Sequence, residues 1–154
     1  MNIFILDKDP YRAAQYLCDK HIVKMCLETA QILSTINGGP YKPTHPNHPC
    51  TLWAGDLMGN YRWLVAHGKG IAEEYKRRYG KEHKSAEVIH ALEWPLNPIP
   101  EGNSEFALAM PIEYKSDDAV ESYRNYYMSK KDFCNWTNAE IPEWFLERLN
   151  VSCA

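Results

Sequence analysis

A histidine and a glutamate lie seven residues apart in the apolar segment LCDKHIVKMCLE, at positions 17–28. Seven residues are two turns of an α-helix, so His21 and Glu28 project from the same helix face. A buried carboxyl group can act as an acid or a base, and an imidazole carries protons near neutral pH. The pair is therefore our first candidate for catalysis. In the competing interpretation His21 makes a satisfied hydrogen bond, Glu28 pairs with Lys24, and the residues do no chemistry.

The segment NGGPYKPTHPNHPC at positions 37–50 is the second candidate. Its four prolines restrict the backbone to extended forms, so we interpret it as an ordered site loop. His45 and His48 would contact a phosphate or a carbonyl group, or would only anchor the loop. Together with Cys50 they are residue types that bind zinc, but their spacing matches no standard finger. We expect no metal and no cofactor.

Two further stretches mix cations with aromatic rings. The run KRRYGKEHK at 76–84 reads as solvated surface, with a phosphate contact by Arg77 or Arg78 as the alternative. The run SYRNYYMSKK at 122–131 suits base stacking and phosphate contact, or its tyrosines belong to the core. The predicted substrate-binding residues are Lys20, Lys24, Lys42, His45, His48, Arg62, Tyr123, Arg124 and Tyr127.

The elements that must position these residues are mostly helices. Residues 2–6, NIFIL, predict a short strand, and Asp7 or Asp9 can then cap a helix that begins at Pro10. That helix is expected to continue to residue 36 and to stop at NGGP. Helical spacing over residues 51–80 predicts a second helix, or two helices with a break between residues 55 and 59.

The second half of the chain predicts shorter elements. Short helices are expected over 85–94 and 142–149, and a longer one from Ser116 or Asp117 to about Lys131. Residues 95–115 are proline-rich and should be irregular. We therefore predict one mainly α domain over residues 1–154, a compact helical bundle with a short N-terminal strand or extended segment.

Composition and charge exclude several classes of protein. The net charge of −3 argues against a general nucleic-acid binder, because phosphates are held mainly by clustered Lys and Arg. No apolar run reaches the ~20 residues of a membrane span, and we see no secretory signal. Five cysteines without a CxxC motif fit a reducing compartment, so we expect a cytoplasmic protein, in the host cytoplasm if it is viral. Cys153, next to last, excludes a prenylation box.

The order of segments resembles the bacteriophage-type pyrimidine-dimer DNA glycosylase family. The resemblance is carried by L-x-D-x-H-x6-E, here Leu17, Asp19, His21 and Glu28. It continues in a proline-containing approach to the next helix (HPCTLWAG, then NYRWL and KRRYG) and in the late aromatic cluster SYRNYY. The resemblance implies a compact all-α fold that acts on DNA.

The same resemblance implies a reaction. Glu28 would be the catalytic glutamate, His21 would lie beside the pocket, and the amino-terminal amine would attack the sugar C1′ to form an imine. An α-amino group suits this role because its usual pKa of ~7.7–8.0 leaves a neutral fraction at physiological pH. This chain departs from the family in its leading MNIFILD, from which we expect Met1 to be retained and its amine to lie far from Glu28. It also has Leu27 and Gln31 where the family has phosphate-binding arginines.

Three functions stay open at this point. The first is an enzyme, a glycosylase/lyase or a nucleotide-cleaving hydrolase, that cleaves a glycosidic or phosphodiester bond with Glu28 and His21 as its acid/base pair. The second is a viral protein on the same scaffold that sequesters or degrades a small (cyclic) nucleotide signal. The third is a helical interaction module without chemistry. The expected partner is DNA or a small nucleotide, with no membrane, and a homo-oligomer is compatible with each function.

Overall fold

The computed structural model describes residues 1–153, with side chains through residue 150, and its regular structure is helical. The helices are α1 (Pro10–Tyr16), α2 (Asp19–Asn37), α3 (Pro49–Asp56), α4 (Met58–Tyr79), α5 (Ala86–Ala91), α6 (Ala119–Met128) and α7 (Glu143–Cys153), with a short 3-10 turn at Ile112–Tyr114. The predicted mainly α bundle is confirmed, and no β-strand occurs within residues 1–153. The assignment of the whole chain to one domain stays a prediction.

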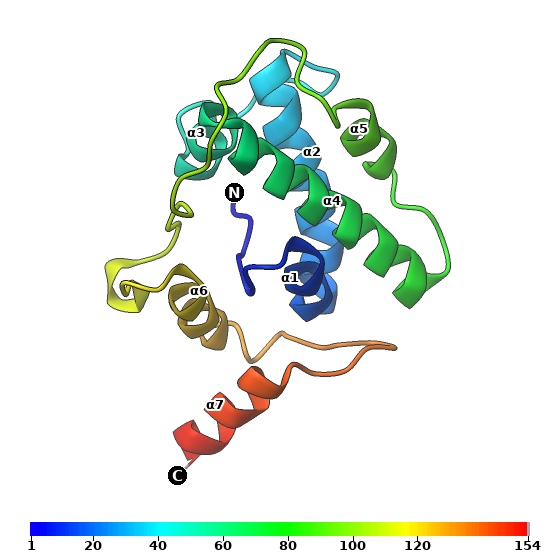
Figure 1. Cartoon of the computed structure of the whole chain (residues 1–154). Helices are drawn as coiled ribbons and strands as arrows, with labels where there is room; N and C mark the ends of the chain where they lie inside the picture. The colour runs from blue at the N-terminus through cyan, green and yellow to red at the C-terminus, as the bar shows by residue number, and fades with distance from the viewer. Residues whose placement is uncertain (154) are drawn as a thin grey trace.

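Helices α2 and α4 cross at the centre of the molecule, and the shorter helices α1, α3 and α5 pack around them (Figure 1). Gly68 of α4 permits a close approach at this crossing. A Cβ atom at that position would lie 2.8 Å from Cγ2 of Thr29 in α2. The close packing against α4 therefore holds α2, which carries His21 and Glu28, in a fixed place.

The predicted strand at residues 2–6 is wrong, although the alternative of an extended segment holds. The segment lies in the interior among helices and has no strand beside it with which to pair (Figure 1). Its polar groups are satisfied in other ways: the Asn2 side-chain oxygen accepts hydrogen bonds from the backbone N–H groups of Ile3 and Phe4, at 2.7 and 3.0 Å. The Asn2 amide donates to the Ala109 carbonyl at 2.7 Å. The Asn2 side chain thus holds the start of the chain in place through hydrogen bonds to the neighbouring backbone and to Ala109.

The single helix predicted over residues 10–36 is also wrong, because the chain breaks at Leu17 and Cys18, whose backbones are extended. Groups outside the helix satisfy the backbone at the break: Cys18 N–H donates to the Tyr127 hydroxyl at 2.9 Å, and Asp19 N–H donates to the Asn135 carbonyl at 2.7 Å. The predicted start is confirmed, with Asp9 as the N-cap of α1. The break brings α6 and the segment after it against the start of α2.

The two-helix alternative for residues 51–80 is confirmed, with the break at Leu57. The freed N–H groups of Met58 and Gly59 donate to carbonyls of the proline-rich segment, at Pro100 and Gly102. The later helices differ from the prediction only at their ends, since Asp118 caps α6 and α7 runs to Cys153, whose side chain lies outside the described residues. None of the described helices is long and apolar enough to cross a membrane.

Candidate functional site

The α-amino group of Met1 lies against the carboxylate of Glu28. The amine nitrogen is 3.2 Å from Glu28 Oε1, and the two side chains are only 3% and 8% exposed. The expectation that the leading segment holds the amine far from Glu28 is therefore wrong. The segment threads back through the core instead of extending away from it. Glu28 also does not pair with Lys24, which lies on the exposed face of α2.

The seven-residue spacing on α2 matches the length of the segment that lies along it. Met1 sits at Glu28, and three residues later the Phe4 ring stacks on His21, with 4.3 Å between ring centroids. Seven helical residues rise about 10 Å, and three extended residues cover about the same distance. His21 and Glu28 thus hold two different points of the N-terminal segment.

Phe4 adopts a backbone conformation that bulky residues rarely take, with φ at +47°. Such strain persists only where the surroundings hold it, and here aromatic rings do so. The Phe4 ring is edge-on to Tyr127 at 5.5 Å, and Lys130 Nζ lies 5.8 Å from its centroid. The bend at Phe4 leaves residues 1–3 pointing along α2 toward Glu28.

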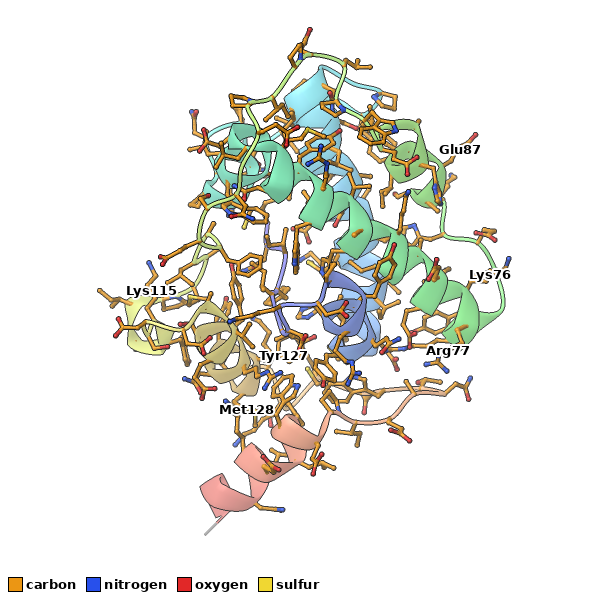
Figure 2. All side chains as sticks on the ribbon, viewed as in Figure 1. Lys76, Arg77, Glu87, Lys115, Tyr127 and Met128 are labelled. Atoms are coloured by element: carbon orange, nitrogen blue, oxygen red, sulfur yellow. The ribbon has the colours of Figure 1, made fainter. Side chains whose placement is uncertain are left out.

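His21 is fixed by a hydrogen bond between its Nδ1 and the Tyr127 hydroxyl at 2.7 Å. Tyr127 is fully buried at the inner side of α6, and Figure 2 shows its side chain directed toward the N-terminal half of the molecule. The Cys18 thiol lies beside the same groups, and a hydrogen bond with the Cys134 thiol lowers its pKa. The satisfied hydrogen bond of His21 agrees with a supporting role for this residue, and its predicted catalytic role stays a prediction.

The N-terminal end of α3 forms another wall beside the amine. His48 is the N-cap of α3, and its pKa is lowered by burial and by the nearby α-amino group. Burial raises the pKa of the Cys50 thiol to about 12, and this thiol contacts the backbone of Ile3 and the Tyr123 hydroxyl. Two segments of the predicted site, the loop 37–50 and helix α2, therefore meet at Met1.

The other predicted cations lie on the outer surface. Lys20 and Lys24 are exposed on α2, and Lys20 Nζ lies 4.9 Å from the centroid of the Phe133 ring. Lys42 and His45 are exposed in the loop, where His45 Nδ1 is 2.7 Å from the Thr44 hydroxyl. Their predicted contacts with a substrate stay predictions.

The remaining predicted substrate-binding residues are engaged within the protein. Tyr123 is fully buried, and its hydroxyl donates to the Ala107 carbonyl at 2.5 Å. Arg124 donates to the Leu6 carbonyl at 3.0 Å, which helps to anchor the N-terminal segment. Arg62 is exposed and forms an ion pair with Glu101 at 3.2 Å.

Arg77 and Arg78, proposed as minor phosphate contacts, both pair with Glu74 of α4. The Arg78 side chain is fully buried and also reaches Asp19 at the start of α2, at 3.2 Å. Burial raises the pKa of Glu74, but the two guanidinium groups overcome this effect and hold it below its usual value. Arg78 thus joins α4 to α2 and is part of the interior.

The site is closed in this structure. Two cavities of about 660 and 760 Å³ lie elsewhere, the first beside Arg12 and Arg77 and the second beside Lys8 and Phe106. Among the side chains that the structure describes, those of residues 1–150, no group of three or more His, Cys, Asp or Glu is arranged to hold a metal ion. What the arrangement offers chemically is a buried primary amine beside a carboxylate.

Sequence reasoning missed the placement of Met1 and the role of Phe4. The apolar run at residues 2–6 predicts a strand or an extended segment, and of these an isolated strand cannot satisfy its backbone. A usable signal was the polar Asn2 in this apolar run, because its side chain can satisfy two backbone N–H groups and turn the chain.

One comparison with known proteins identifies a relationship. The model of a family described as pyrimidine dimer DNA glycosylase matches residues 1–88, more than half of the 154 residues. The match covers the N-terminal segment and helices α1 to α4, and so includes both Met1 and Glu28. The aromatic cluster SYRNYY lies outside it. No curated protein and no solved structure matches the chain.

Proposed function

This chain belongs to the pyrimidine dimer DNA glycosylase family, and we propose that it is a DNA glycosylase/AP lyase. Its nucleophile is the α-amino group of Met1, and Glu28 is its acid/base group. The observation that carries the proposal is the 3.2 Å distance between this amine and Glu28 Oε1. Lysine amines are the more common imine-forming groups, but an α-amino group is neutral to a larger extent near pH 7.

The reaction begins when the neutral amine attacks C1′ of the damaged nucleotide. A bond forms between the amine nitrogen and C1′, the glycosidic bond breaks, and the base leaves with a proton. Opening of the sugar ring then gives an imine between the protein and C1′. Removal of a proton from C2′ breaks the bond to the 3′ phosphate, which cleaves the strand. In this proposal Glu28 takes the proton from the amine and moves protons in the later steps.

The second oxygen of Glu28 supports this role. Glu28 Oε2 is buried and has no hydrogen-bond partner among the described residues. A buried polar atom without a partner is costly, so such atoms are unusual in stable interiors. A sugar hydroxyl that entered the site would donate a hydrogen bond to Oε2 while Oε1 stays with the amine.

A substrate must open the site, because the amine and the carboxylate are nearly inaccessible. Enzymes that act on a nucleotide in a duplex also require the DNA to open, because the target nucleotide must leave the base stack. The exposed Lys20 and Lys24 lie on the helix that carries Glu28, and we assign them to phosphate contact. His21 supports the N-terminal segment through Phe4.

The test is borohydride trapping on duplex DNA that contains an abasic site or a thymine dimer. The protein is expressed with Met1 as its first residue and is compared with Glu28→Gln. A matched control is Glu87→Gln, because Glu87 is exposed on α5 and points to solvent in Figure 2. We expect an adduct and strand cleavage for the parent and for Glu87→Gln. Cleavage should fall by about 10²–10⁴-fold in Glu28→Gln.

Folded parent protein that gives neither an adduct nor cleavage would overturn the proposal. The same protein should then be screened for binding and turnover of small linear and cyclic nucleotides, the ligands of the alternative function. An unchanged rate in Glu28→Gln, with an adduct still formed, would remove Glu28 from the mechanism and leave the amine.

A further inference from the structure

His48 connects the start of α3 to the start of the chain. It is the last residue before α3, and its Nδ1 accepts the backbone N–H of Cys50 at 3.1 Å. An imidazole nitrogen that accepts a hydrogen bond carries no proton, so in the neutral ring the proton is on Nε2. One side of the ring therefore caps a helix, and the other side is a hydrogen-bond donor.

The other ring nitrogen is left to donate to the residue that carries the amine. A hydrogen bond between His48 and the Met1 backbone raises the pKa of the ring, whereas burial, the α-amino group and His45 lower it more strongly. Glu28 is the negative charge that acts on the same ring. The ring is thus neutral near pH 7, which is the form in which one nitrogen accepts and the other donates.

The next residues of α3 continue this contact. The Cys50 thiol is fully buried and forms a hydrogen bond with the Ile3 backbone. The N-terminal end of α3 therefore contacts the first three residues at two places. Figure 1 shows the first residue ending beside α3.

We propose that His48 is a positioning residue that ties the Met1 main chain to the N-terminal end of α3 and so keeps the α-amino group at Glu28. This inference rests on the proposed function. A hydrogen bond from His48 to the Met1 main chain fixes the direction in which the amine points. Misplacement of a reacting group by about 1 Å can cost about 10²-fold in rate.

Two substitutions separate positioning from capping. Asparagine is among the best N-cap residues, so His48→Asn keeps the cap of α3 but is too short to reach Met1 as well. His48→Ala loses both functions. We expect both variants to form the DNA adduct about ten- to a hundredfold more slowly than the parent, with a lower melting temperature only in His48→Ala.

The matched control is His90→Asn. His90 is exposed on α5 and lies outside the candidate site. This variant should trap DNA at the parent rate. If His48 only caps the helix, His48→Asn will also trap at the parent rate, and that result would overturn the proposal.

Amide hydrogen exchange over residues 3–6 provides a readout that needs no activity. Exchange in this segment should be faster in His48→Asn than in the parent and in His90→Asn, because the first residue is released. If the parent gives no DNA adduct, the proposed function fails while this comparison still decides the role of His48. Equal exchange in the three proteins would overturn the positioning role.

Discussion

His67 gives the fold a pH dependence whose sign can be derived. The side chain is fully buried in α4, with Nδ1 2.9 Å from the Pro10 carbonyl and Nε2 3.1 Å from the Ile3 carbonyl. A neutral ring has one N–H, so it donates to one of these carbonyls only. Protonation would satisfy both carbonyls but would bury a charge. Burial is the larger effect, and it lowers the pKa of His67 from 6.5 to about 4.

The sign of this pH dependence follows from whether the folded or the unfolded state protonates His67 first as the pH falls. Below pH 6.5 the unfolded chain protonates at His67 while the folded protein does not, so the free energy of unfolding falls as the pH falls. The loss is complete near pH 4 and amounts to about 3 kcal/mol, since each pH unit between the two pKa values contributes about 1.4 kcal/mol.

Urea denaturation of the parent and of His67→Gln across this pH range tests the reasoning. Glutamine can still donate to one carbonyl but does not titrate, so the other ionisable groups cancel in the comparison. We expect His67→Gln to be less stable near pH 7, and the difference to shrink by about 3 kcal/mol toward pH 4. If the free energies of unfolding of the two proteins change with pH in parallel, the conclusion that burial keeps His67 neutral is refuted. If the difference in the free energy of unfolding grows on acidification, the hydrogen bonds from a protonated ring to the two carbonyls outweigh the cost of burying its charge.

Two other substitutions test the packing around the site. Tyr127→Phe should lower the free energy of unfolding by about 1–3 kcal/mol, because the hydroxyl that bonds to His21 is lost, and Tyr126→Phe is the matched control. Equal effects of the two changes in chemical denaturation would contradict the assigned bond. Gly68→Ala should cost about 1–3 kcal/mol, because its Cβ would lie 2.8 Å from Thr29 Cγ2, and an unchanged melting temperature would contradict this close approach.

Local signals in the sequence predicted much of the helical framework. Asp9 before Pro10 and Gly38 after residue 37 marked helix ends that the structure confirms. The break between α1 and α2 was not predictable in this way, because Leu17 and Cys18 carry no helix-breaking signal. The break is stabilised by the Tyr127 hydroxyl, more than 100 residues away.

The candidate site was predictable in part for a similar reason. Periodicity placed His21 and Glu28 on one face of a helix, and both side chains are indeed buried. The partner of Glu28 could not be found by spacing, since it is a main-chain amine at position 1 and not a side chain. Only the path of residues 1–6 through the core brings that amine to Glu28.

Identification of the residue that forms the DNA adduct tests the central claim most directly. The borohydride-reduced complex with abasic DNA is digested with nuclease and trypsin, and the modified peptide is sequenced by mass spectrometry. Trypsin releases residues 1–8, MNIFILDK, as the first peptide. We predict that the sugar remnant lies on the α-amino nitrogen of Met1. A remnant on a lysine side chain, with Met1 unmodified, would contradict the account.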